Sequence, residues 1–230
     1  SSAAGAREEI AQAADPALRM FTVTRATALE PQANCTGGWA VSHPATAGGF
    51  SAVGYYYARE LRTALGVPVG MIHSAWGGTP IEAWLDRASL AGDPALAPLI
   101  TRYDDALAHY DQQVYLQVAP ALRAYLAQAD AAKAAGRPVP AFPALAMPGG
   151  NPRNQSFLSS LYNGMIAPVV PYAAAGAIWY QGEANVGRAR AYRTLLPALI
   201  QGWRAAWGQE HFAFLIVQLP NYQATRPQPS

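Results

Sequence analysis

The stretch from Ala174 to Asn185 reads AAGAIWYQGEAN and joins an apolar segment to a polar one without a turn residue between them. Its apolar part, 177–180, predicts a short buried strand. The residues that follow are Gln181, Gly182, Glu183, Ala184 and Asn185. Amide and carboxylate groups are costly to desolvate, so at the carboxyl end of a core strand they are either fully hydrogen-bonded or used chemically.

Working outward from this strand, apolar runs that predict strands alternate with segments of helical periodicity. The predicted strands are 19–25, 69–75, 177–180 and 212–219, and the predicted helices are 51–65, 79–84, 93–136, 161–170 and 188–207. Ser51 and Thr79 are expected to cap the first two helices, Gly66 to end the first, and Pro197 to kink the last or mark where it restarts. This alternation predicts an α/β fold with a mostly parallel central sheet and helices on both faces. We expect the strands at 69–75, 177–180 and 212–219 to be parallel neighbours in one sheet.

Residues 93–152 are predicted to be an insertion in a single domain that covers residues 1–230 and is incomplete at both ends. The first part is Ala-rich and helical, with an apolar stripe at three- and four-residue spacing. Five prolines and two glycines then fall between Arg137 and Pro152, which predicts a long loop.

Composition excludes several classes of protein. With 51% hydrophobic and 13% charged residues, the 230-residue chain can bury a sizeable core. Its 16 basic and 14 acidic residues contain no dense basic run, so we expect no nucleic-acid partner. No apolar run approaches the ~20 residues that span a bilayer, so we expect no membrane partner. A single cysteine, Cys35, and four histidines without metal-ligand spacing lead us to expect no metal and no other cofactor.

Two turns at the carboxyl ends of predicted strands are expected to face one crevice: 74–79 and 181–185. Neither contains a phosphate-binding glycine motif. Gly77 and Gly78 fit either a tight turn that needs positive φ or a bare backbone N–H that approaches a ligand, as an oxyanion hole requires. The second turn fits either a satisfied buried network, or an arrangement in which Asn185 offers its NH₂ to an oxyanion while other residues hold the loop.

Three long motifs in order carry a family resemblance. They are VPVGMIHSAWGGTPIEAW (67–84), LYNGMIAPVVPY (161–172) and GAIWYQGEANVGRARAY (176–192). With FSAVGYYYARELRTALGVPVG and FAFLIVQLPNY, they resemble the sialate O-acetylesterase family of the SGNH hydrolase superfamily over nearly the whole chain. The resemblance implies a three-layer α/β/α domain that removes acetyl groups from acetylated carbohydrates through a serine nucleophile, in a secreted or periplasmic protein.

The resemblance also implies roles for residues in the two turns. The family's glycine block falls on Gly77 and Gly78 and its asparagine block on Asn185, which makes these residues the expected oxyanion hole. Gln181, Gly182 and Glu183 are then supporting residues. The blocks that carry the serine nucleophile and the Asp/His pair are expected just before Ser1 and after Ser230, so the 230 residues alone are expected to be inactive.

Other interpretations remain open at this point. His73 and Ser74 are neighbours on a strand, so their side chains point to opposite faces and cannot form a nucleophile–base pair. An acetylxylan esterase of the same superfamily would share the site. A sugar-binding module without catalysis is the alternative from another class, with Trp39, Trp76 and Trp84 as possible stacking platforms and core packing as the simpler interpretation of Trp84.

Overall fold

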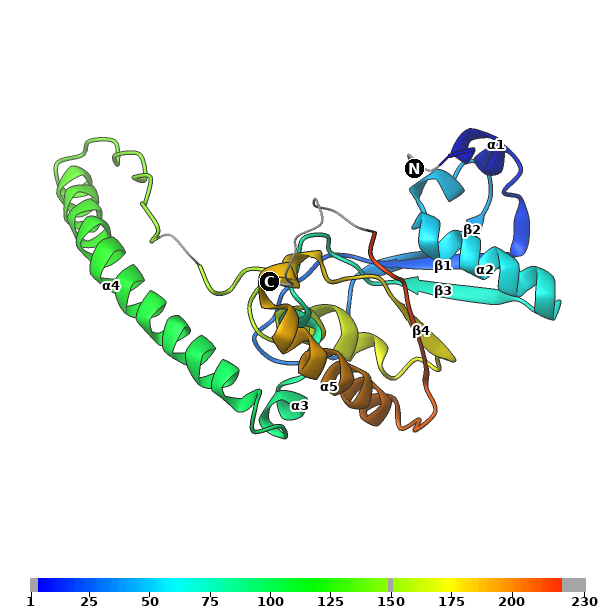
Figure 1. The fold of residues 1–230 in the computed structure, drawn as a ribbon. Coiled ribbons are helices and arrows are strands. Elements are labelled where there is room, and N and C mark those ends of the chain that lie inside the picture. The colour runs from blue at the N-terminus through cyan, green and yellow to red at the C-terminus, as the bar shows by residue number, and fades with distance from the viewer. Residues whose placement is uncertain (1–3, 149–150, 221–230) are drawn as a thin grey trace.

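The computed structural model describes residues 4–148 and 151–220, in which helices and strands alternate (Figure 1). The strands are β1 (Asp15–Val23), β2 (Gly37–Ser42), β3 (Val69–His73), β4 (Gly176–Trp179) and β5 (Ala213–Ile216). The α-helices are α1 (Ala6–Ala11), α2 (Ala52–Leu65), α3 (Arg87–Ala91), α4 (Ala97–Ala134) and α5 (Ala189–Trp207). Short 3₁₀ or π turns are η1 (Ala47–Gly49), η2 (Ile81–Trp84), η3 (Tyr162–Ile166), η4 (Ala167–Val169) and η5 (Glu183–Arg188). The chain is therefore an α/β protein, as its sequence predicts.

The strands form two sheets rather than the single sheet that we expected. One sheet has the order β2-β1-β3, with β1 antiparallel to β2 and parallel to β3, and the other is the parallel pair β4-β5. The prediction that β4 and β5 are parallel neighbours is confirmed, but the prediction that β3 pairs in the same sheet is wrong. Apolar runs indicate where strands form, whereas the choice of neighbours depends on contacts distant in sequence.

The helix α2 covers one face of the three-stranded sheet, and its ends follow the predicted signals. Ser51 Oγ accepts a hydrogen bond from the backbone N–H of Gly54 at 3.3 Å, and Gly66 ends the helix in the left-handed conformation at φ 68°. The buried residues of this contact are Ala13, Leu18, Met20, Ala47, Phe50, Tyr55 and Ala58.

A second core joins α5, β4 and β5 to the short helix η2 through large aromatic side chains. The ring of Trp179 lies edge-on to Trp84 and to Trp203, with centroid distances of 6.3 and 5.9 Å. Trp203 Nε1 donates to the backbone oxygen of Trp84 at 3.0 Å. The helix α5 runs on through Pro197, where a kink or a restart was predicted. Trp84 is therefore a core residue, in agreement with the simpler interpretation of its sequence context.

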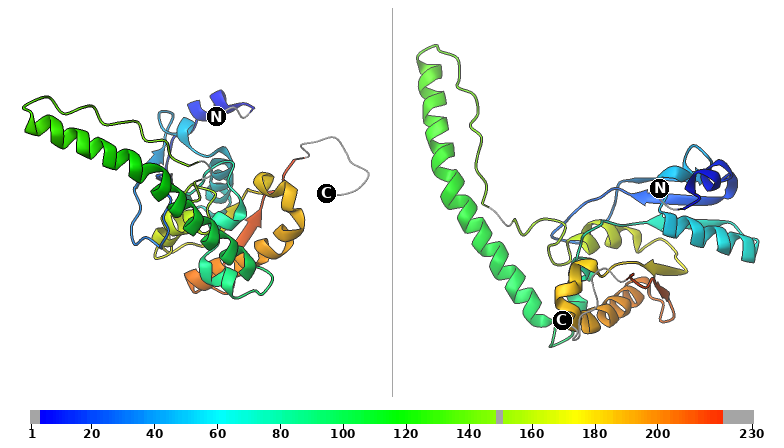
Figure 2. Two further views of the ribbon diagram at one scale, coloured as in Figure 1. Left: turned by 90° about the vertical axis from the view of Figure 1, so that its left-hand side faces the viewer. Right: turned by 45° about the horizontal axis from the view of Figure 1, so that its top comes forward.

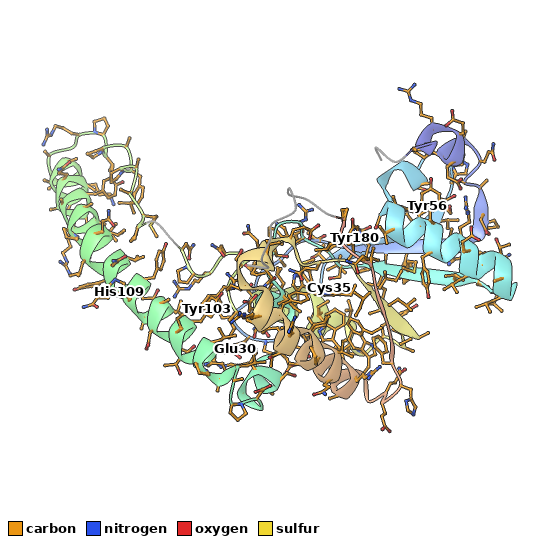
Figure 3. The ribbon with its side chains drawn as sticks, viewed as in Figure 1. Glu30, Cys35, Tyr56, Tyr103, His109 and Tyr180 are labelled. Carbon is orange, nitrogen blue, oxygen red and sulfur yellow. The ribbon has the colours of Figure 1, made fainter. Side chains whose placement is uncertain are left out.

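The helix α4 projects away from the rest of the protein, and the segment after it runs back along its length (Figures 1 and 2). Its 38 residues lie within the predicted helix at 93–136. Arg153 on the returning segment pairs with both carboxylate oxygens of Asp111 at 2.6 and 2.8 Å. Tyr103 packs edge-on against Phe157, at the end of α4 nearer the body, and His109 lies further out (Figure 3). Within the described residues, no helix is both long and apolar enough to cross a membrane.

Candidate active site

The two predicted turns, which follow β3 and β4, lie in direct contact. Gln181 Nε2 donates to the backbone oxygen of Thr79 at 2.9 Å, and the backbone N–H of Ile81 donates to Asn185 Oδ1 at 2.9 Å. Each turn begins at the carboxyl end of its strand. The contact therefore brings the carboxyl ends of β3 and β4 together at one place, although the two strands belong to different sheets and do not pair.

The glycine turn is exposed and bare on its outer side. Gly78 has φ +78°, a conformation that glycine adopts without strain, whereas Gly77 does not have a positive φ. A Cβ built on either residue would meet no atom within 4 Å. Gly77 is therefore needed neither for backbone conformation nor for packing within the described part of the chain. Its bare backbone leaves room for a ligand to approach the turn closely.

Thr79 holds the inner side of this turn. Its hydroxyl donates to the backbone oxygen of Trp76 at 2.7 Å and accepts from Trp84 Nε1 at 2.9 Å. The sequence predicted that Thr79 would cap the following helix, and this prediction is wrong. The short helix η2 begins after Pro80, and no side chain caps it. The backbone N–H of Ile81, which a cap at Thr79 would bond, donates instead to Asn185 Oδ1, and the Thr79 hydroxyl bonds within the turn.

Asn185 is the centre of a buried hydrogen-bond network and is only 1% exposed. Its Oδ1 accepts from the Ile81 backbone and from Gln181 Nε2, the latter at 2.8 Å. Its Nδ2 donates to Glu82 Oε2 at 2.8 Å. These partners also determine the orientation of the amide, because its oxygen faces two donors and its nitrogen faces a carboxylate. One of the two amide hydrogens is thus committed to Glu82.

Glu82 is a buried carboxylate that the sequence analysis did not single out. It is 1% exposed, and its Oε1 accepts from Arg188 Nη2 at 3.1 Å. Arg188 itself is 45% exposed, so the pair connects a buried charge to the surface. A buried carboxylate is stable only when it is paired and hydrogen-bonded. The sequence signal that could have found it is an acidic residue inside the apolar IEAW segment, directly after the glycine turn.

The other residues of the second turn differ in how far they join this network. Gln181 Oε1 accepts from the Tyr192 hydroxyl at 3.0 Å, and burial raises the pKa of Tyr192 above its ordinary value. Gly182 has φ +149°, and a Cβ there would lie 2.8 Å from a methyl carbon of Leu219. Glu183 is exposed and makes no side-chain hydrogen bond within the described residues. The structure thus brings Gln181 into the network, joins Gly182 to Asn185 only through a backbone hydrogen bond at 2.9 Å, and leaves Glu183 outside the network.

His73 and Ser74 lie near this site but do not bond to one another. Ser74 Oγ donates to the backbone oxygen of Met165 at 3.0 Å, which agrees with side chains on opposite faces of the strand. The Nδ1 atom of His73 is buried and has no hydrogen-bond partner in the described part of the chain. Burial lowers the pKa of His73, and the charge of Arg25 lowers it further.

Comparison with known proteins finds relatives that share one name. The chain is 33% identical to the sialate O-acetylesterase of Rattus norvegicus over 229 residues, which cover 91% of the chain and 38% of that protein. It is 30% identical to the sialate O-acetylesterase of Homo sapiens over 177 residues, with 74% and 25% covered. A solved carbohydrate acetylesterase from Xanthomonas citri matches with a TM-score of 0.66 and 33% identity, over 94% of this chain and 37% of that one. No protein-family model matches.

The structure defines an α/β protein in which two strand-end turns form one polar site. The sequence relationships then identify the family, because curated relatives from several mammals carry the same name. The chain belongs to the sialate O-acetylesterase family. It spans 38% of the length of the rat relative and 25% of the length of the human one.

Proposed function

We propose that the whole protein is a carbohydrate O-acetylesterase that hydrolyses acetyl esters of sugars by serine-dependent acyl transfer. Family membership and the solved carbohydrate acetylesterase support this proposal. The observation that carries it in this chain is the contact between a bare glycine turn and a polar network at the carboxyl ends of two strands. We further propose that the whole protein has a three-layer α/β/α arrangement and is secreted or periplasmic.

In the proposed reaction a serine oxygen attacks the carbonyl carbon of the acetyl ester, and the carbonyl oxygen becomes an oxyanion. A histidine takes the serine proton and gives it to the departing sugar oxygen, after which water hydrolyses the acetyl-serine. The serine and the Asp/His pair are proposed to come from outside residues 1–230. Within the chain, the backbone N–H of Gly77 or Gly78 is the proposed first donor to the oxyanion.

Asn185 is the proposed second donor, through the amide hydrogen that Glu82 does not take. The bond from Nδ2 to Glu82 and the two bonds to Oδ1 fix the plane of the amide, so the remaining N–H has one direction. A donor fixed before reaction stabilises the developing charge without reorganisation. Gln181 and Gly182 hold the turn. Since Asn185 is 1% exposed, this role requires the acetyl group to enter directly against the turn.

Release of acetate from acetylated sugars by the full-length protein tests this function. We expect acetate from an O-acetylated sialate, from acetylated xylo-oligosaccharides or from both, and the ratio of the two values of kcat/KM separates the sialate esterase from the acetylxylan esterase. A folded full-length protein that binds these sugars without releasing acetate would instead be the sugar-binding module.

Residues 1–230 expressed without further sequence are predicted to lack esterase activity. In the structure the Ser74 hydroxyl is bonded to a backbone oxygen and His73 does not face it, so these residues do not form a nucleophile–base pair. Hydrolysis of p-nitrophenyl acetate at neutral pH is the measurement. Turnover above a protein blank that disappears in Ser74→Ala would identify Ser74 as the nucleophile and contradict this prediction.

A further inference from the structure

Arg25 lies at the rim of the proposed site, next to the glycine turn. It follows β1 by two residues, and β1 runs parallel to β3 in a register that pairs Thr22 with His73. The segments that follow β1 and β3 therefore leave the sheet at the same end. The guanidinium carbon of Arg25 lies 5.6 Å from the centre of the Trp76 ring. Trp76 directly precedes Gly77, so the arginine is held beside the bare part of the turn.

Arg25 carries a positive charge without a carboxylate partner among the residues that the structure describes. The arginines that pair with carboxylates are Arg59, Arg62, Arg87, Arg153 and Arg188. Arg25 is exposed and makes no ion pair or hydrogen bond within the described residues. Glu82, the buried carboxylate of the site, is already paired with Arg188. The charge of Arg25 is therefore available to an anion from outside this part of the chain.

The position over the Trp76 ring suits a guanidinium that is to bind a ligand. The ring attracts the cation electrostatically and does not take its N–H groups as a carboxylate would, so they stay available. Two parallel N–H groups match the two oxygens of a carboxylate, which a lysine ammonium cannot do. Because the contact with Trp76 restricts the Arg25 side chain, less side-chain freedom is lost when a ligand binds. Trp76 is half-buried, so it can also offer its remaining surface to a sugar ring.

We propose that Arg25 is a specificity-determining residue, which pairs through its guanidinium with the carboxylate of an acidic acetylated sugar held beside Trp76. The proposal rests on the proposed esterase function and adds to it the residue that selects acidic over neutral sugars. Arg25 does not touch the reacting ester in this scheme. Its substitution should therefore raise KM for acidic substrates and leave kcat and neutral substrates nearly unchanged.

Kinetics of the full-length protein with three substrates test this role: an O-acetylated sialate, the methyl ester of the same sugar, and an acetylated neutral sugar. We expect Arg25→Gln to raise KM for the sialate about tenfold, because a charge-assisted pair is lost, with little effect on the other two. Arg25→Lys should recover only part of the loss. Added salt should raise KM for the sialate alone. An acetylated glucuronate in place of the sialate shows whether any sugar carboxylate is sufficient.

Arg102→Gln is the matched control, since the guanidinium carbon of Arg102 also lies over an aromatic ring, 5.3 Å from the centre of Tyr103, but Arg102 is on α4. It should change none of the three KM values. Equal effects of Arg25→Gln on acidic and neutral substrates would overturn the proposal. If the full-length protein releases no acetate from any sugar, the proposed function fails, and calorimetric binding of sialate and its methyl ester decides the role of Arg25. Equal affinity of Arg25→Gln and the parent for sialate would then overturn it.

Discussion

The two turns that meet at the site are built differently, although they lie in contact. The turn after β3 presents bare backbone at Gly77 and Gly78, with open space where side chains would be. The turn after β4 instead uses its side chains for a network in which the side chain of Asn185 makes three hydrogen bonds and the residue is 1% exposed. The turn after β3 is thus open to a ligand, and the turn after β4 fixes the position of the turn after β3. The two turns thus differ in role: residues of the first can contact a substrate, and residues of the second hold the first in place. Four predictions test this difference.

The largest effect is expected from Asn185→Ala in the full-length protein. If Asn185 is a donor to the oxyanion, kcat should fall by roughly 10²–10³ with a smaller change in KM. The variant also leaves the Ile81 N–H and the Oε2 atom of Glu82 without their hydrogen-bond partner, which should lower the free energy of unfolding by about 2–4 kcal/mol. Steady-state kinetics and urea unfolding measure the two effects.

Asn163→Ala is the control for this prediction. Asn163 is also buried, and its Nδ2 donates to the backbone oxygens of Ala28 and Leu29 at 3.2 and 2.8 Å, neither of which belongs to the two turns. Its loss should lower stability but leave kcat unchanged. If Asn185→Ala folds and keeps kcat within a few-fold of the parent, Asn185 only holds the turn and the donor role is wrong.

Removing the buried carboxylate should have the next largest effect, on stability. Glu82→Ala removes the acceptor of the buried Asn185 Nδ2, and a buried donor left without a partner costs about 1–3 kcal/mol. Arg188 is 45% exposed, so water can replace its pair with Glu82. Asp104→Ala breaks the exposed pair with Arg87 and should cost less than about 1 kcal/mol. Urea unfolding of both variants is the comparison, and equal losses would show that the network around Glu82 is not special.

Single alanine substitutions in the glycine turn should separate its two residues. Gly78→Ala forces a side chain into φ +78° and should cost about 1–2 kcal/mol of stability. Gly77→Ala should leave stability unchanged, since its Cβ would meet nothing within 4 Å. A fall in kcat/KM for Gly77→Ala at full stability would therefore show that a ligand approaches this residue. Unchanged kcat/KM in both variants would argue against the turn as an oxyanion hole.

The smallest effect concerns His73, whose pKa is lowered by burial and by Arg25. The folded protein holds this proton less tightly than the unfolded chain, so stability should fall as the pH decreases below the ordinary histidine pKa of about 6.5. His73→Gln should remove this part of the pH dependence. By NMR, Arg25→Gln should raise the pKa of His73. An unchanged pKa in that variant would mean that Arg25 is not near His73 in solution.

The sequence predicted best what is decided locally. The ends of α2 followed from Ser51 and Gly66, and the structure shows both signals at those positions. The strand β2 was missed because Gly37 and Gly38 interrupt its pattern. Gly37 is required there, since a Cβ would lie 2.5 Å from the Phe21 ring. Local pattern does not reveal a packing demand from a neighbouring strand.

The position of the candidate site could be predicted from the sequence, but the hydrogen bonds and ion pair that join its residues could not. The strand-end rule predicted that the turns at 74–79 and 181–185 share one edge, and they lie in contact. The pairing of Glu82 with Arg188 joins residues 106 positions apart, so no short window of sequence contains it. The prediction of the sheet to which β3 belongs was wrong for the same reason: β3 pairs with β1, and nothing in the sequence of β3 specifies this partner.

The projecting helix α4 also has a hydrodynamic consequence. Its 38 residues make a rod about 57 Å long, whereas a compact chain of 230 residues has a radius of gyration of about 17 Å. The rod makes rotational diffusion anisotropic, since turning about its axis displaces less solvent than tumbling end over end. The N–H bonds of α4 lie along that axis, so in solution their ¹⁵N relaxation should report the slow end-over-end tumbling. Strand N–H bonds that are perpendicular to the axis should show a shorter apparent correlation time, like that of a smaller molecule.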